Sequence, residues 1–192
     1  MSTVKSKKLQ VGTDARATNN FTIYQPSTPD GTLRIGVGNA DSPTEVGQFN
    51  NNGYVNTTAP VFRAYSTVNQ TGVAAGTITK ILFDTEEYDI GGNFASSRFT
   101  APIDGYYHFS ATTHIVGANG LPQVDLLVNG TLKAYGNIIY AVNSSVNPNL
   151  STTVYLAAGD YAEAAAFSTS GSFYFYGNSQ LTWFSGFLVR AA

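Results

Sequence analysis

Alternation of apolar and polar residues constrains the fold of this chain most strongly in the run that follows Gly105. Most odd-numbered side chains there are apolar, and the even-numbered side chains from His108 to His114 are polar. The apolar set is Tyr107, Phe109, Ala111 and Ile115, and the polar set is His108, Ser110, Thr112 and His114. A period of two residues places alternate side chains on opposite faces of an extended chain. The run therefore predicts a half-buried β-strand whose odd positions face a core.

Throughout residues 61–192, short apolar runs are separated by turn residues, and no stretch has the 3.6-residue period of a helix. This part of the chain is predicted to be all-β. Strands are expected near residues 61–66, 77–83, 98–101, 105–116, 123–129, 131–137, 150–156, 160–168, 172–176 and 181–190. Asn129 and Gly130 predict a two-residue hairpin turn. These strands are enough for two packed sheets, a β-sandwich.

Two runs near the C-terminus carry apolar side chains on both faces of the expected strand, Phe173 to Tyr176 and Trp183 to Val189. The inner face can pack on the opposite sheet. The apolar side chains of the outer face then need a second protein surface that shields them from water. Only 11% of the residues are charged, against roughly 25% in ordinary domains, so another copy of the chain is the simplest neighbour. We therefore expect a trimer or a dimer. The residues assigned to the core and the subunit interface are Tyr107, Phe109, Phe173, Phe175, Trp183, Phe184, Phe187 and Leu188.

Composition argues against several classes of partner and cofactor. The formal net charge is −2 and the ten basic residues are scattered along the chain, so nucleic-acid binding is not expected. No apolar stretch approaches the ~18 residues that a membrane-spanning helix requires. The chain has no cysteine, which excludes disulfides and thiolate metal sites, and no cofactor is expected. The first residues lack the apolar run of a secretion signal, so none is expected.

Residues 1–60 differ from the rest of the chain, because they are rich in Thr, Asn, Gly and Pro and contain only short apolar clumps. Such a segment cannot bury a core by itself. Turn residues at 25–31, 36–39 and 50–53 predict short strands joined by turns. We therefore expect an extended N-terminal anchoring arm, residues 1–60, followed by one domain, residues 61–192. The residues assigned to anchoring are Lys5, Lys7, Lys8, Leu9, Phe21 and Tyr24.

Two groups of residues suggest metal ligands, and neither is assigned to a metal site. His108 and His114 are expected on one strand face, but they lie about 20 Å apart along an extended chain, so one ion cannot bridge them. Copies of one histidine around a trimer axis are the alternative to an ordinary interface histidine. The acidic residues between Asp84 and Asp89 offer oxygen ligands suited to calcium, but without the spacing of a calcium loop. A solvated turn is the preferred interpretation.

None of the sequence motifs of metalloproteases, serine hydrolases or phosphate-binding enzymes occurs in the chain. Gly36-Val37-Gly38 lacks the third glycine of a dinucleotide-binding loop and is expected to be a turn. The carboxylate pairs of glycosidases cannot be recognised from spacing, so Asp125 and Glu163 are kept as a pair that could meet in space. The protein is expected not to be an enzyme.

Residues 99–109, Phe-Thr-Ala-Pro-Ile-Asp-Gly-Tyr-Tyr-His-Phe, resemble the signature of complement C1q and tumour necrosis factor-like domains. Segments similar to other parts of that family occur in the family's order at 83–84, 156–161 and 184–188. Gly105 is interpreted as the residue that allows a tight turn into the long strand. The resemblance covers about residues 61–190. It implies a two-sheet jelly-roll sandwich of about ten strands that assembles as a tight homotrimer.

The arm has a resemblance of its own. Segments 9–12, 20–22 and 31–36 are similar to the N-terminal regions of tail-fibre and related virion proteins of tailed bacteriophages. The resemblance implies a location in the virion, with other capsid or tail proteins as partners of residues 1–60. The lysines near the N-terminus are interpreted either as a solvated terminus or as a docking site for an acidic capsid or tail surface.

Together these expectations predict a structural protein of a bacteriophage virion. It would be a homotrimeric capsid decoration, cement or head-fibre protein that is anchored by its N-terminal arm. The alternative is a short tail-fibre or receptor-binding protein that recognises a host-surface glycan through exposed Tyr and Asn side chains. A glycan-cleaving enzyme is the third interpretation.

Overall fold

The chain divides into two compact units, Met1–Ala59 and Pro60–Ala192, in the computed structural model. The structure describes residues 8–11, 20–38, 42–51, 53–55 and 59–192. Within these ranges all repetitive structure is β-strand and no helix occurs. A helix able to cross a membrane is accordingly not found among the described residues. The all-β fold class predicted from the alternation of side chains is confirmed.

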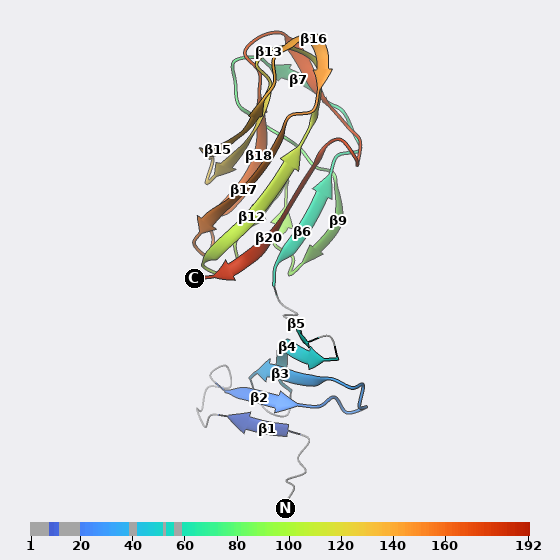
Figure 1. Ribbon diagram of the computed structural model, residues 1–192, viewed down its shortest axis with the longest axis vertical. Coiled ribbons are helices and arrows are strands. Elements are labelled where there is room, and N and C mark those ends of the chain that lie inside the picture. The colour runs from blue at the N-terminus through green and yellow to red at the C-terminus, as the bar shows by residue number, and fades with distance from the viewer. Residues whose placement is uncertain (1–7, 12–19, 39–41, 52, 56–58) are drawn as a thin grey trace, which may run out of the picture. The chain divides into compact units, whose positions relative to one another are not determined.

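The N-terminal unit is one antiparallel sheet of five strands that follow one another in chain order (Figure 1). Its strands are β1 (Lys8–Val11), β2 (Phe21–Tyr24), β3 (Leu33–Val37), β4 (Thr44–Asn50) and β5 (Gly53–Val55). Gly31, between β2 and β3, has a φ of 83°, and Gly53, which begins β5, has a φ of 111°. Glycine adopts this conformation without steric cost. The described part of residues 1–59 therefore contains short strands joined by turns.

The C-terminal unit contains three antiparallel sheets. The first sheet has the order β17-β12-β20-β6-β9, with β6 (Val61–Tyr65), β9 (Thr85–Ile90), β12 (Gly105–Thr112), β17 (Asn149–Leu156) and β20 (Trp183–Ala191). The second has the order β10-β11-β18-β14-β15 with β8 beside β18, and contains β8 (Thr79–Lys80), β10 (Phe94–Ala95), β11 (Arg98–Thr100), β14 (Gln123–Val128), β15 (Thr131–Ile138) and β18 (Tyr161–Phe167). The third has the order β16-β13-β19-β7, with β7 (Gln70–Ala74), β13 (His114–Gly120), β16 (Ala141–Val146) and β19 (Ser172–Tyr176).

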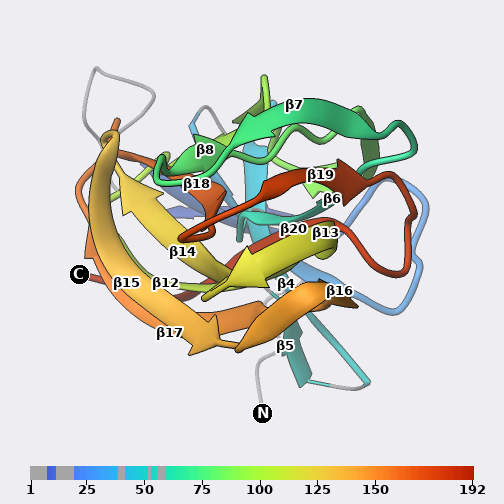
Figure 2. The ribbon, with the colours of Figure 1, turned by 90° about the horizontal axis from the view of Figure 1, so that it is seen from above.

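An aromatic core joins the first two sheets into a sandwich. The ring of Phe62 on β6 stacks on Phe94 at 4.7 Å and on Phe99 at 5.0 Å, and both partners belong to the second sheet. Full burial of one such ring is worth roughly 1.5–3 kcal/mol, and an aromatic pair adds about 0.5–1.5 kcal/mol. Seen from above, the strands curve around this core, and β15 lies beside β17, where the edges of the two layers meet (Figure 2).

The single strand expected at 105–116 is instead two strands, because Thr113 separates β12 from β13. Thr113 is fully buried, and its hydroxyl lies 3.4 Å from the hydroxyl of Thr182. The Thr182 hydroxyl also accepts a hydrogen bond from the backbone N–H of His114 at 3.2 Å. These bonds take the place of the β12–β20 ladder, and β13 continues in the third sheet between β16 and β19.

Two glycine predictions have different outcomes. Gly105 is not a turn residue but the first residue of β12, where an added Cβ would lie 2.8 Å from the Arg190 carbonyl oxygen. Gly105 therefore allows β12 to approach β20 closely, because it has no Cβ. The Asn129-Gly130 hairpin turn is confirmed, since both residues have positive φ, 51° and 74°, as a type I′ turn requires.

Candidate interaction surface

One face of the first sheet lies in the core and the other lies outside it. Strand register identifies the side chains that share the outside, here called the outer face. The outer face consists of Val61, Arg63, Tyr65, Thr85, Tyr88, Ile90, Tyr106, His108, Ser110, Thr112, Asn149, Ser151, Thr153, Tyr155, Trp183, Ser185, Phe187 and Arg190. Alternation accounts for this division, since Tyr107 and Phe109 are fully buried while their neighbours on β12 are not.

Large aromatic side chains on the outer face are half exposed. The exposed fractions are 48% for Tyr106, 47% for Tyr155 and 46% for Phe187. Tyr106 and Tyr155 face each other across β12 and β17, with ring centroids 5.6 Å apart in an edge-to-face arrangement. Exposed aromatic surface of this kind is typical of an interaction site.

Short polar side chains separate these aromatic residues. The two ring nitrogens of His108 lie 3.1 Å from the Thr153 hydroxyl and 3.2 Å from the Ser110 hydroxyl. The Ser151 hydroxyl lies 3.3 Å from the same histidine. The His108 ring also packs against Phe187 at a centroid distance of 5.3 Å. The polar groups of this region are therefore hydrogen-bonded within the sheet, which lowers the cost of covering them.

Arg63 organises the end of the outer face near β9. Its guanidinium lies over the ring of Trp183 at 5.5 Å and near that of Tyr65 at 5.9 Å. It also pairs with Glu87 and donates to the Ser179 carbonyl oxygen at 3.0 Å. A hollow of about 340 Å³ opens beside these residues. The Arg63 charge is therefore paired with a carboxylate and also lies on aromatic faces.

The predicted core and interface residues separate into two groups. Tyr107, Phe109, Phe173, Phe175 and Phe184 are buried in the core. Trp183 and Phe187 belong to the outer face, and Leu188 is partly buried against the core. The outer face also contains residues that sequence analysis left out of the assigned set, above all Tyr106 and Tyr155. Alternation alone identifies Tyr106 as an outward neighbour of Tyr107, whereas the pairing of Tyr155 with it depends on the fold.

The residues predicted to anchor the arm are divided between the two faces of the N-terminal sheet. Lys5 and Lys7 lie outside the described residues. Leu9 and Phe21 share one face and are 59% and 51% exposed, whereas Lys8 and Tyr24 pair with each other across β1 and β2 on the opposite face.

The solvated turn expected at Asp84–Asp89 is wrong, because Thr85–Ile90 forms β9 at the edge of the first sheet. Asp84 accepts hydrogen bonds from the N–H of Thr67 at 2.9 Å and the hydroxyl of Thr85 at 2.7 Å. Burial would raise the pKa of Asp84, but the hydrogen bonds from Thr85 and Thr67 outweigh it and lower the pKa. Asp89 accepts from the N–H groups of Asn93 and Phe94. These acids cap backbone groups, and among the described residues no three His, Asp or Glu side chains are placed to share a metal ion.

The expectation that His108 and His114 share one strand face is also wrong. The break at Thr113 puts them on β12 and β13, in different sheets. The Nδ1 atom of His114 lies 2.7 Å from Oδ1 of Asn147, and its ring packs edge-to-face with Tyr176.

Asp125 and Glu163 do come together on neighbouring strands, β14 and β18, two register positions apart. Burial raises the pKa of Asp125, against a lowering by the Gln123 side chain. Burial would also raise the pKa of Glu163, but hydrogen bonds from Lys80 and Arg98 outweigh it and lower the pKa. Opposite pKa shifts are typical of glycosidase pairs. Here, however, Asp125 is fully buried and Glu163 is 5% exposed, so a polysaccharide has no access to them.

Comparison with known proteins shows which family and which solved structures the chain is similar to. A model of the family described as "C1q domain" matches residues 62–189. No curated protein matches the chain.

Solved structures similar to the chain include three jelly-roll proteins. The globular domain of zebrafish complement 1qA protein has 15% identity and a TM-score of 0.50, covering 70% of this chain and 99% of its own. Murine APRIL has 11% identity and a TM-score of 0.54, covering 68% and 99%. Eiger TNF from S. frugiperda has 10% identity and a TM-score of 0.51, covering 70% and 95%. At these identities the similarity establishes the fold of the C-terminal unit.

Proposed function

The chain belongs to the C1q domain family, and we propose that it is a non-enzymatic structural protein that works as a homotrimer, with the outer face buried between copies. The observation that carries this proposal is the half-exposed aromatic cluster of Tyr106, Tyr155 and Phe187. The resemblance of residues 99–109 to C1q and tumour necrosis factor-like domains supports the same assembly.

The composition of the outer face favours burial in a protein interface. Aromatic residues and arginine are enriched in such interfaces, while Lys, Glu and Asp are depleted. Apart from the histidine, the outer face carries two charged side chains: Arg63, which is paired with Glu87, and Arg190, which lies exposed opposite Tyr106 near the end of β20. Association over the centre of the outer face therefore covers aromatic rings and hydrogen-bonded hydroxyls and leaves Arg63 paired, whereas burial of an unpaired charge would be costly.

Measurement of molecular mass in solution tests the assembly. Purified full-length protein should have three times the chain mass of 20.4 kDa. Phe187→Glu places a carboxylate opposite His108 on the outer face and should dissociate the trimer, because a buried unpaired charge costs several kcal/mol. Tyr135→Glu is the matched control, since Tyr135 is 63% exposed but lies on β15 in the second sheet.

Two results would contradict this assignment. A monomeric wild-type protein at micromolar concentration removes the trimer altogether. A Phe187→Glu variant that stays trimeric shows that the outer face is not the interface.

The proposed setting of the trimer is a bacteriophage virion, where it decorates or cements the capsid or forms a head fibre, anchored by residues 1–60. The support is the likeness of segments 9–12, 20–22 and 31–36 to phage tail-fibre and virion proteins. Quantitative mass spectrometry of purified particles tests this setting. Decoration requires hundreds of copies for each particle and a fibre tens, whereas absence of the chain from particles refutes a virion role.

A second candidate function is recognition of a host-surface glycan by a short tail fibre. The observation in its favour is a pair of strongly exposed tyrosines, Tyr135 at 63% and Tyr140 at 76%, on and just after β15. Exposed aromatic rings beside amide groups suit contact with sugar rings. Binding of purified protein to host polysaccharide, lost in Tyr140→Ala, would support this function, and cleavage of the polysaccharide would point to the enzymatic alternative.

A further inference from the structure

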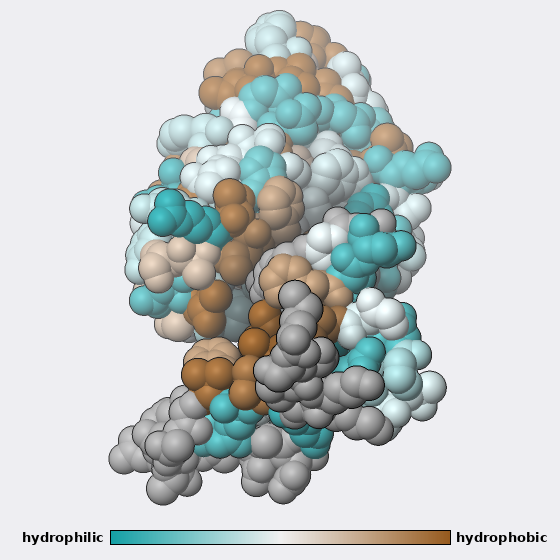
Figure 3. Space-filling view, turned by 60° about the horizontal axis from the view of Figure 1, so that its bottom comes forward, coloured by the Kyte–Doolittle hydropathy of each residue, from teal (hydrophilic) through white to brown (hydrophobic). Residues whose placement is uncertain are grey.

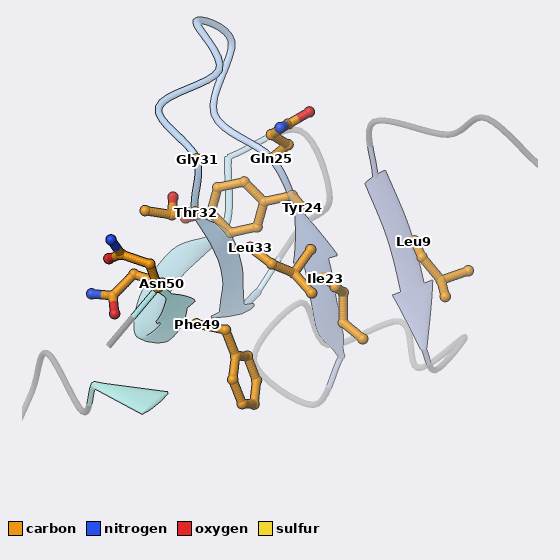
Figure 4. A pocket seen from close by; sticks show the side chains of 10 residues that line it. Leu9, Ile23, Tyr24, Gln25, Gly31, Thr32, Leu33, Phe49 and Asn50 are labelled. Carbon is orange, nitrogen blue, oxygen red and sulfur yellow. The ribbon is translucent and has the colours of Figure 1, made fainter. Parts of the chain in front are cut away.

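The N-terminal sheet gathers most of its apolar side chains on one side. Strand register places eight apolar residues on one side, here called the apolar face: Leu9, Val11, Phe21, Ile23, Leu33, Ile35, Val37 and Phe49. Four successive strands contribute to it, and Figure 4 shows Leu9, Ile23, Leu33 and Phe49 around one hollow of about 620 Å³.

The opposite side of the same sheet is polar and held together by ion pairs. Arg34 on β3 pairs with Asp30 at 2.6 Å and with Glu45 on β4 at 2.9 Å. Hydrogen bonds from Thr32 and Arg34 lower the pKa of Asp30 to about 2. A face built of such groups is suited to water, so the apolar face is the one that requires a cover.

Nothing within the described part of the N-terminal unit covers the apolar face. The exposed fractions are 59% for Leu9, 56% for Val11, 51% for Phe21, 47% for Leu33 and 46% for Phe49. Hydrophobic residues gather into patches on the molecular surface (Figure 3).

The size of this surface indicates what kind of partner it fits. Two of the five side chains are phenylalanines, which bury roughly 150–250 Å² each when fully covered, and the three aliphatic ones are somewhat smaller, so the half-exposed set leaves on the order of 500 Å² open. A stable complex between separate proteins buries about 800 Å² on each partner. The apolar face alone is thus too small for an independent partner. It is large enough for chains that are already held together, because a covalent link raises their effective concentration.

We propose that the apolar faces of the N-terminal sheets pack against one another in the assembled protein, so that other copies of this chain are the partner. The inference rests on the trimer proposed above, which holds three N-terminal units in one particle. The apolar face carries no charged side chain, so identical copies meet without like-charge repulsion. Leu9 and Phe21 are then occupied by self-association, and anchoring to other proteins falls to the polar side, which carries Lys8 and Tyr24.

The absence of cysteine from the chain allows a direct test with introduced thiols. Leu9→Cys and Gln10→Cys change neighbouring residues of β1 that point to opposite faces of the sheet. Each alkylation rate is divided by the rate for the same variant in denaturant, and the molecular mass is measured on every sample. In the trimer the Leu9→Cys thiol should react at least about tenfold more slowly than the Gln10→Cys thiol. Adding Phe187→Glu, which dissociates the trimer, should abolish that difference.

Each other outcome overturns the inference in a recognisable way. Equal rates in a chain of trimeric mass leave the proposed trimer intact and show that the apolar face is open. Protection that persists in the Phe187→Glu monomer shows that the chain covers the face by itself. A monomeric wild-type mass refutes the proposed trimer and this inference together. Phe49→Cys and Gln48→Cys on β4 form a second matched pair if a substitution in β1 prevents folding.

Discussion

Neutralising Glu163 tests whether a buried carboxylate holds the second sheet together. Oε1 of Glu163 on β18 lies 2.7 Å from Nζ of Lys80, and 2.9 Å and 3.0 Å from Nη2 and Nε of Arg98. Its partners come from β8 and β11, so the carboxylate connects three strands. Arg98 also stacks over the ring of Tyr161 at 3.6 Å. In Glu163→Gln the side-chain shape is kept while the negative charge is removed.

The expected loss of unfolding free energy is about 2–3 kcal/mol. Removing one partner of a fully buried ion pair costs about 3–5 kcal/mol, and the Glu163 side chain is 7% exposed. The side chains of Lys80 and Arg98 are 28% and 41% exposed, so water screens part of their attraction. The amide oxygen of glutamine also retains one acceptor for the two cations. Both effects bring the expected loss below the value for full burial.

The pH dependence follows from the lowered pKa of Glu163. Because the folded pKa lies below the ordinary value of 4.5, the stabilisation is fully present above that value. It is lost as the pH falls through the folded pKa, where the wild-type carboxylate is protonated. The difference between wild type and Glu163→Gln should therefore be large at pH 7 and shrink in acid.

Urea unfolding followed by the fluorescence of Trp183, the single tryptophan of the chain, measures this loss. Protein concentration must be held constant, since assembly adds to apparent stability. Glu86→Gln is the matched control, because Glu86 is exposed on β9 and the substitution removes the same charge. A loss of less than about 1 kcal/mol, or an equal loss in the control, would refute a stabilising role for the buried pair.

Three further predictions concern the same unit. Asp125→Asn should raise stability at pH 7, since the folded pKa of Asp125 is raised and its ionised form is disfavoured by burial; the gain should disappear below the ordinary value of 3.8, as urea titrations at several pH values can check. Gly186→Ala should destabilise by about 1–3 kcal/mol, because its Cβ would lie 2.6 Å from Phe109 and 2.8 Å from Phe62; an unchanged melting temperature would contradict the tight packing. Calcium should leave the melting temperature unchanged, because Asp84 and Asp89 already cap backbone groups and Glu87 pairs with Arg63, and a rise that chelator reverses would reinstate a calcium site.

The strands that the sequence pattern did not predict share one position in the fold. Strands β7, β9, β10 and β16 were not expected, and all four lie at the edge of a sheet. An edge strand has one neighbour and is often polar, so its residues lack the apolar alternation that identifies a strand. β9 illustrates the point, since its acidic residues are typical of a turn by composition and yet pair with β6 along five register positions.

The candidate surface was predictable to a similar extent. Two-sided apolarity of the C-terminal run identified Phe187 as a residue in need of a second neighbour, and it is half exposed on the outer face. Alternation also separated Tyr107 from His108. The partners of these residues were not predictable, because Tyr155 lies far along the chain from Tyr106 and reaches it only through the pairing of β12 with β17.

Local geometry explains what the sequence determined by itself. The direction of a side chain on an extended backbone depends on its own position, so the pattern alone established the all-β class, the inward set on β12 and the hairpin at Asn129-Gly130. Only the tertiary structure decided which strands pair, that Thr113 divides the long strand between two sheets, and that Glu163 meets Lys80 and Arg98. Those outcomes depend on hydrogen bonds between distant segments, and residue alternation carries no information about which segments will meet.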